Sequence, residues 1–409
     1  MSASRSRRRR IVLFPRPDHQ DAIAISDVLR METFGGIFML AAAVAGLVWA
    51  NLHTASYRSV QQIGIGPLDL QHWAADGLLA IFFFVAGMEL KRELTAGSLR
   101  RPAQAMVPIA AAIGGMIVPA LLYLAINLTM PGGRVEGWAI PMATDIAFAL
   151  TVLALAGPRL PAGLRAFLLT LAIVDDIGAI AVIAVVFTSS LAWLWLGGAL
   201  ACAAAWYVLQ RLRIDLWPIY VVLFLITWWC MFSSGVHATI TGVLLGLLTR
   251  TSADESLDPI DRWEHFWRPI SSSIAVPIFA LMSAGVVVTG PALQRIVTEP
   301  VALGIIAGLL LGKVLGISGA AWLTARLTSA TLPEGLRWTD VFAVAMLGGI
   351  GFTVALLVAE LSFPGEAELL DAAKAAVLLG SLLSALIAAL MLHRRRPSQV
   401  PSWEDGSPE

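Results

Sequence analysis

Charged residues are scarce in this 409-residue sequence. Only 14% of the residues are charged, whereas the apolar set makes up 58%. A soluble domain is nearer to about a quarter charged, because its surface must be solvated. Lys and Arg total 28 and Asp and Glu total 28, so the formal net charge is zero. The composition therefore argues against a water-soluble enzyme, against intrinsic disorder and against a nucleic-acid-binding protein with a broad basic surface.

Two other patterns are missing. The 2 Cys cannot form a disulfide framework or a cysteine metal cluster. The apolar runs are continuous and rich in Ala and Leu, without the alternation that a membrane β-barrel needs. We therefore expect an all-α protein in lipid, with no cofactor.

Long windows without any charge indicate how often the chain crosses the membrane. Residues 102–133, 177–210, 216–249 and 269–294 contain no Asp, Glu, Lys or Arg. One crossing needs about 20 apolar residues, so the longer windows must hold more than one span. Charges and helix breakers together predict a polytopic protein with twelve transmembrane helices. The expected spans are 34–52, 72–91, 104–128, 138–156, 164–187, 191–209, 216–232, 235–249, 269–290, 301–326, 339–361 and 371–393.

Basic residues are divided unequally between the two sides of these spans. If the N-terminus is cytoplasmic, the outer side keeps only Arg58, Arg134 and Arg295. The positive-inside rule then predicts that both termini are cytoplasmic. We expect a basic N-terminal segment at 1–33, a single membrane transport domain at 34–393 and a cytoplasmic tail at 394–409.

Four ionisable side chains fall deep inside predicted spans: Asp145, Asp175, Asp176 and Lys313. Such residues are costly in a membrane and mark functional sites. One Asp–Lys pair could merely hold helices together, but three carboxylates against one ammonium leave a deficit that burial does not tolerate. Protons, a bound cation, or both in turn must neutralise it.

The neighbouring pair Asp175 and Asp176 suits such an exchange. Adjacent side chains on a helix point about 100° apart, so one can turn towards Lys313 while the other lines a cavity. Carboxylates that titrate as a coupled unit also attract hard cations, which prefer oxygen ligands. Competition between protons and a cation for this pair is sufficient for an exchanger.

Helix breakers interrupt two predicted spans, at Pro141–Asp145 and at Gly348–Thr353. Non-helical backbone at membrane depth is tolerated where it lines a cavity or packs on protein. Matching interrupted spans in the two halves of a transporter point to a binding site between inverted repeats. Glycines in membrane helices also serve close packing, so both interpretations stay open.

Six motifs, in order between about residues 32 and 390, resemble those of the NhaA-type sodium/proton antiporters. They are Gly87-Met-Glu89-Leu-Lys91-Arg92-Glu93, Ala143-Thr144-Asp145-Ile-Ala-Phe148, Val174-Asp175-Asp176-Ile-Gly178-Ala179, Val236-His237-Ala238-Thr239, Gly312-Lys313-Val-Leu-Gly316 and Gly349-Ile-Gly351-Phe352-Thr353. The resemblance implies twelve helices with inverted repeats, of which helices 4 and 11 are discontinuous and cross near the ion site. The broken backbone of helix 11 would include Gly348, Gly349 and Gly351.

The resemblance also implies an activity. Asp176 would be the principal ligand of the transported sodium and Asp175 the second, paired with Lys313 in one state. Asp145 and Thr144 would lie at the helix crossing. The activity would be electrogenic, pH-regulated extrusion of sodium, and also of lithium, in exchange for protons by alternating access. The protein would lie in the plasma (inner) membrane of a bacterium. Its partners would be the lipid bilayer and the transported ions, without nucleic acid.

Charges at the cytoplasmic mouth carry two interpretations. Glu89, Arg92 and Glu93 fall on one helix face, where a solvated salt bridge would explain them equally well. The resemblance makes them part of a funnel that senses pH, together with Glu264 and His237. His237 could titrate near neutral pH or could simply be a hydrogen-bonded residue at a helix end.

The outer segment 52–70 is short. In the family this segment forms a β-hairpin that helps to join a homodimer, so the dimer contact is open here.

Alternatives to sodium exchange remain. A transporter of another substrate, such as potassium or a proton-coupled solute, would use the same carboxylates. An intramembrane aspartyl protease needs a second Asp after Gly-x-Gly, but Phe352 stands there. A prenyl-transfer enzyme needs Asp-Asp-x-x-Asp, but only Ile, Gly and Ala follow Asp176.

Overall fold

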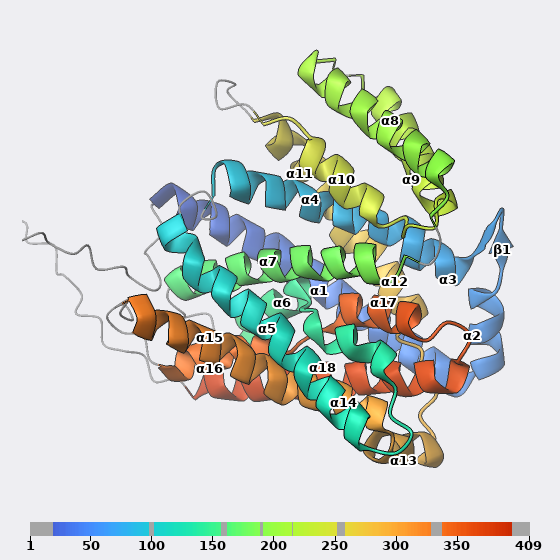
Figure 1. The fold of residues 1–409 in the computed structure, drawn as a ribbon, viewed down its shortest axis with the longest axis vertical. Coiled ribbons are helices and arrows are strands. Elements are labelled where there is room, and N and C mark those ends of the chain that lie inside the picture. The colour runs from blue at the N-terminus through green and yellow to red at the C-terminus, as the bar shows by residue number, and fades with distance from the viewer. Residues whose placement is uncertain are drawn as a thin grey trace, which may run out of the picture.

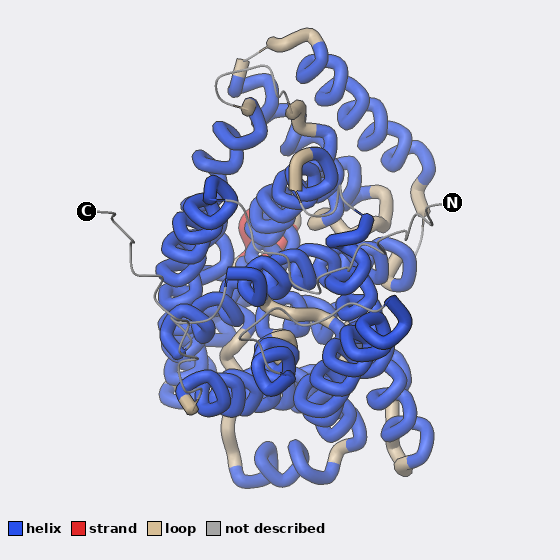
Figure 2. The backbone as a smooth tube through the Cα atoms, turned by 90° about the vertical axis from the view of Figure 1, so that its left-hand side faces the viewer, coloured by secondary structure: helices blue, strands red, loops and turns tan. Residues whose placement is uncertain are grey.

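The computed structural model describes residues 19–97, 102–156, 162–188, 191–214, 216–251, 258–328 and 338–394. Helices make up nearly all of this backbone (Figure 2). The expected tail 394–409 lies outside the described residues apart from Arg394. The first helix begins at His19, because the sequence 19–33 contains no Pro or Gly that would stop it, and its apolar part Phe34–Leu52 coincides with the first expected span.

The elements follow the chain in a simple order (Figure 1). The α-helices are α1 His19–Leu52, α2 Thr54–Gln61, α3 Leu70–His72, α4 Leu79–Thr95, α5 Pro102–Thr129, α6 Ile146–Ala156, α7 Ala162–Val186, α8 Trp193–Arg211, α9 Trp217–Ser233, α10 Ile240–Leu248, α11 Pro259–Ile270, α12 Val276–Ser283, α13 Gly290–Thr298, α14 Pro300–Ala307, α15 Lys313–Thr328, α16 Trp338–Leu347, α17 Phe352–Ser362 and α18 Ala367–His393. Short π-helical turns η1 Trp73–Leu78, η4 Ser271–Ala275 and η5 Gly308–Gly312 continue neighbouring helices, and η3 Val135–Met142 is a 3₁₀-helix. The strands are β1 Gly64–Ile65 and β2 Leu68–Asp69.

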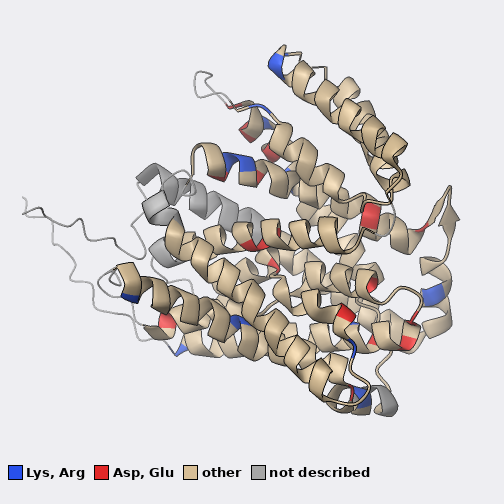
Figure 3. Cartoon of the chain, viewed as in Figure 1, with Lys and Arg blue, Asp and Glu red and all other residues tan. Residues whose placement is uncertain are grey.

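Many of these helices can cross a membrane. Among the described residues, seven helical stretches are long and apolar enough, or up to nine if each of two bent helix pairs counts as one span. The seven are Phe34–Leu52, Leu70–Thr95, Met106–Thr129, Ala166–Val186, Trp193–Arg211, Pro300–Thr328 and Ala367–His393. Charged positions gather near helix ends, and a few acidic ones lie in the middle of the molecule (Figure 3). The prediction of an all-helical, multi-pass membrane protein is confirmed.

Three expected spans fall on shorter helices. The span expected at 216–232 corresponds to α9, which has 17 residues, and the one at 235–249 corresponds to α10, which has 9. The span expected at 269–290 corresponds to η4 and α12, which end at Ser283. The α8–α9 hairpin stands at one end of the molecule (Figure 1).

The two bent pairs are η3 with α6, at 42°, and α16 with α17, at 48°. Between the members of each pair, residues 143–145 and 348–351 are not helical. These breaks coincide with the helix-breaking segments found in the sequence.

Helices α5 and α15 approach each other through glycines. A Cβ on Gly316 would lie 2.1 Å from the carbonyl oxygen of Gly114, and a Cβ on Gly312 would lie 2.6 Å from Cα of Pro119. Small residues allow this contact, as in other membrane helix pairs. The close approach brings Lys313, the first residue of α15, into the middle of the molecule.

A short β-hairpin follows α2, within the segment 52–70. The two strands pair antiparallel, with Gly64 opposite Asp69 and Ile65 opposite Leu68. The indole of Trp73 donates a hydrogen bond of 2.8 Å to the carbonyl of Ile65, which ties the hairpin to η1. The segment is therefore long enough for a hairpin despite its apparent shortness in the sequence.

Candidate functional site

The two helix breaks meet in the interior. The backbone N–H of Asp145 donates to the carbonyl of Ile350 over 2.6 Å. The hydroxyl of Thr144 donates to the carbonyl of Gly348 over 2.8 Å. A break leaves backbone groups without their helical partners, and here each break supplies partners for the other.

Asp145 caps two helices at once. Its Oδ1 accepts a 2.9 Å hydrogen bond from the N–H of Phe148 in α6, and its Oδ2 accepts a 3.0 Å bond from the N–H of Thr353 in α17. Both N–H groups belong to the first turn of a helix, where the positive end of the helix dipole favours an anion. The carboxylate of Asp145, which is 3% exposed, is therefore held by two positive helix ends.

Glycines at the second break are required by close contacts. A Cβ on Gly349 would lie 2.4 Å from the carbonyl oxygen of Leu309, and one on Gly348 would lie 2.6 Å from the side chain of Ile317. A Cβ on Gly351 would meet a milder contact, 3.0 Å from Cδ2 of Leu309. The N–H of Gly351 donates a hydrogen bond of 3.2 Å to the hydroxyl of Ser381. The glycines thus serve both the break and the packing.

Lys313 reaches the same centre from α15. Its Nζ lies 2.9 Å from Oδ2 and 3.1 Å from Oδ1 of Asp175, and it donates a 3.0 Å hydrogen bond to the hydroxyl of Thr144. The side chains of Lys313 and Asp175 are 0% and 1% exposed. A buried pair of this kind is stable only while both partners are present.

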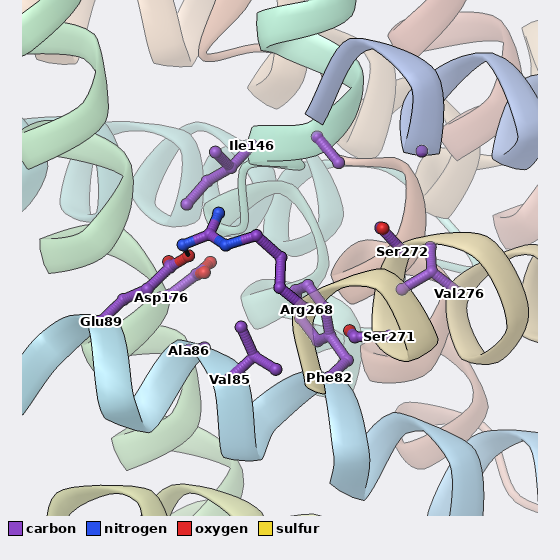
Figure 4. Close-up of a pocket in the computed structure, with 12 residues that line it drawn as sticks. Phe82, Val85, Ala86, Glu89, Ile146, Asp176, Arg268, Ser271, Ser272 and Val276 are labelled. Carbon is purple, nitrogen blue, oxygen red and sulfur yellow. Dashed lines mark ion pairs between the residues drawn. The ribbon is translucent and has the colours of Figure 1, made fainter. Parts of the chain in front are cut away.

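Asp176 has a different environment from its neighbour. It accepts no hydrogen bond from any residue that the structure describes. It lines a cavity of about 40 Å³, together with Glu89 of α4 and Arg268 of α11 (Figure 4). The charges that act on Asp176 include the carboxylates of Asp175 and Glu89. Asp176 therefore offers free carboxylate oxygens to a small cation or a proton.

The cavity wall continues into a network of ion pairs. Arg268 pairs with Glu89 and with Glu264. Arg92 lies 3.1 Å from Glu264 and 3.9 Å from Asp261. Burial raises the pKa of the Asp261 carboxyl, and the positive charge of Arg92 partly offsets this effect. Two of the residues expected at the cytoplasmic mouth, Arg92 and Glu264, are therefore in direct contact.

The remaining two residues of the expected sensor lie elsewhere or make other contacts. Glu93 follows Arg92 in the last turn of α4 and is partly exposed. His237 lies between α9 and α10, where its Nε2 is 3.1 Å from the carbonyl of Phe187. The structure thus gives His237 the hydrogen-bonded position at a helix end, away from the Glu264 network.

Sequence reasoning missed Arg268, which lies between the expected spans 235–249 and 269–290. Helix α11 begins at Pro259, and the carboxylate of Asp258 caps it through the N–H of Ile260. From this start Ile260, Glu264 and Arg268 fall on one face at intervals of four residues, and all three are buried. That spacing was the available signal.

A second buried cluster was also missed. Glu360 at the end of α17 accepts a 2.7 Å bond from Lys374 of α18. Its Oε1 also accepts 3.2 Å bonds from Gln71 and Ser283. The cluster joins α3 and α12 to α17 and α18.

No resident metal centre is apparent in the described part of the chain, where no group of three or more His, Cys, Asp and Glu side chains has a suitable arrangement.

Comparison with known proteins identifies the family. The family described as Na+/H+ antiporter 1 matches residues 26–392. An antiporter named NhaA from Cutibacterium acnes is 53% identical over 380 residues, which cover 93% of this chain and 90% of that protein. The NhaA of Streptomyces antibioticus is 53% identical over 391 residues, covering 93% and 81%. An NhaA of Rhodococcus jostii is 49% identical over 395 residues, covering 93% and 95%.

These relatives are transporters rather than enzymes, and they come from bacteria. Together with the apolar helices, they support a multi-pass protein of the plasma membrane. The chain belongs to the NhaA family of Na+/H+ antiporters.

Proposed function

We propose that this protein exchanges sodium ions for protons across a bacterial plasma membrane, and that Asp176 carries the exchanged ion. The observation that carries the proposal is the contrast between two adjacent carboxylates. Asp175 is neutralised by Lys313 at 2.9 Å. Asp176 accepts no hydrogen bond from a described residue and faces a small cavity. A buried carboxylate in this position must bind either a proton or a cation.

The mechanism follows from competition at this pair. Sodium is a hard cation that binds oxygen ligands, and it displaces the proton from Asp176. When the ion approaches, Asp175 leaves Lys313 and becomes the second ligand, and Lys313, which then lacks a buried counter-charge, gives up a second proton. Two protons for one monovalent ion make the exchange electrogenic. Lithium, with the same charge and the same preference for oxygen, is exchanged as well.

The proposed membrane arrangement has twelve spans built from inverted repeats, with both termini cytoplasmic. Its fourth span is η3 with α6, and its eleventh is α16 with α17. The hydrogen bonds between residues 144–145 and 348–353 support a crossing of these two discontinuous spans. Residues 34–393 form one transport domain, in which the site alternates between the two sides.

The ion-pair network at α4 and α11 is the proposed region of pH regulation. The ion pairs run from the solvent-exposed Asp261 to the cavity of Asp176 through Arg92, Glu264, Arg268 and Glu89. Glu93 and His237 are the other proposed contributors. Protonation of carboxylates in this network changes the pairing of Arg92 and thus access to the cavity.

The hairpin Gly64–Asp69 is the proposed contact between two copies in a homodimer. Ile63 and Ile65 are about half exposed there, at 48% and 53%. Exposed apolar side chains at an extended edge favour association with a second chain.

Proton flux in everted membrane vesicles tests the proposed function. Addition of sodium should collapse a preformed pH gradient, and Asp176→Asn should abolish that response while Asp371→Asn, at an exposed ion pair, should not. If potassium collapses the gradient and sodium leaves it intact at neutral and alkaline pH, the sodium assignment is wrong. If Asp176→Asn responds like the unaltered protein, Asp176 is not the exchange site.

A further inference from the structure

Arg268 is a buried cation in the wall of the ion cavity. It lies in the last turn of α11 and is 4% exposed. Figure 4 shows its guanidinium next to the carboxylates of Glu89 and Asp176, at the end of a side chain that extends along the cavity. An arginine stays protonated at every physiological pH. A permanent positive charge therefore shares the cavity with the carboxylate that carries the exchanged ion.

Arg268 has two carboxylate partners. It pairs with Glu264 on its own helix and with Glu89 on α4. Of these two, only Glu89 lines the cavity with Asp176. Glu264 is held from its other side by Arg92 at 3.1 Å. The pair with Glu264 thus anchors Arg268 next to the cavity, and the pair with Glu89 lies within it.

The cavity is so small that an ion inside it must lie close to the charge of Arg268. Its volume of about 40 Å³ has room for only a few water molecules or a small ion. A sodium ion that enters meets Asp176 and Glu89 as attractive groups and Arg268 as a repulsive one. Interactions between charges are strong at such distances in a partly buried site.

We propose that Arg268 is a positioning residue that acts as a tethered competitor of sodium. Its guanidinium occupies Glu89 while the ion site is empty and lowers the affinity of the cytoplasmic mouth for sodium. Arg268 acts on the ion through Glu89 and through the charge it places beside Asp176. This inference rests on the proposed sodium/proton exchange.

A purely structural role is the alternative. In that case Arg268 only fastens α11 to α4, and its removal lowers stability without a specific effect on sodium. Affinity and maximal rate, measured separately, distinguish the two roles.

Everted vesicles provide the test, because added sodium then meets the cytoplasmic face. Arg268→Gln should lower the apparent KM for sodium at fixed pH by about threefold or more, as expected for loss of one nearby unit charge. Arg268→Lys, which keeps the charge, should stay near the unaltered value. Arg262→Gln, on the exposed side of the same helix, is the matched control and should leave KM unchanged.

If the single variant Arg268→Gln folds poorly, the double variant Arg268→Gln/Glu264→Gln replaces it in the test. It removes both members of the buried pair, and Glu264 does not line the cavity. The fall in KM should therefore persist in it. An unchanged or raised KM in the variants that fold overturns the role of Arg268. If the unaltered protein shows no sodium-driven flux, the proposed function fails instead, so the two failures are distinguishable.

Discussion

At the scale of single residues, the three buried aspartates of the site differ in their hydrogen-bond and ion-pair partners. Three carboxylates lie close together, but each has its own partner. Asp145 holds two helix ends, Asp175 holds Lys313, and Asp176 faces the cavity. Because two of them are satisfied by the protein itself, we propose that the exchange begins at the third. The chemistry is therefore set by hydrogen bonds around neighbours as much as by Asp176.

Removal of Lys313 should show how far the ion pair also supports the fold. In Lys313→Ala, Asp175 is left buried without its counter-charge, which costs about 3–5 kcal/mol. We expect a lower Tm in detergent, measured by thermal unfolding, and impaired sodium exchange. The double variant Lys313→Met/Asp175→Asn should recover much of the Tm. Unchanged stability and transport in Lys313→Ala would remove this pair from the mechanism.

At the scale of elements, close helix packing places the charged groups. The glycine contact between α5 and α15 sets the position of Lys313, and the paired breaks set the position of Asp145. Helix α11 brings Glu264 and Arg268 against α4. Each functional group thus comes from a different element, and their distances depend on backbone contacts that leave no room for larger side chains.

Enlargement of Gly316 should disturb the site from a distance. A Cβ there would lie 2.1 Å from the carbonyl oxygen of Gly114, so Gly316→Leu must force α5 and α15 apart. Overpacking costs about 1–3 kcal/mol, and displacement of Lys313 should also reduce sodium-driven proton flux. Gly319→Leu is a matched control, because a Cβ at Gly319 meets nothing within 4 Å. Equal Tm and flux in the two variants would contradict the packing argument.

At the scale of the whole molecule, the sequence predicts more of the fold than of the site. Uncharged windows locate the helices because lipid excludes charge, and deep carboxylates mark the centre for the same reason. Helix ends were harder to predict: α10 has only 9 residues, where a span over 235–249 was expected. Those ends depend on packing with other helices, and such packing has no signature in the local sequence.

The tertiary contacts of the site could not be predicted from the sequence, because they too depend on packing between helices. Arg268 lies outside the expected spans, and only the packing of α11, which brings it against Glu89, connects it with the site. Glu360 and Lys374 lie near the ends of α17 and α18, and only the folded chain shows that they are a buried pair with Gln71 and Ser283 around them. The family resemblance supplied roles for Asp175 and Asp176, whereas their different surroundings come from the structure.

Competition between sodium and protons for Asp176 is the central claim, and proton release on sodium binding tests it most directly. Sodium chloride is added to the purified protein in weakly buffered detergent solution, and pH is recorded against choline chloride as the control. The unaltered protein should release protons as sodium binds, and Asp176→Asn should release fewer or none. Sodium binding without proton release, or equal release by Asp176→Asn, would contradict the account.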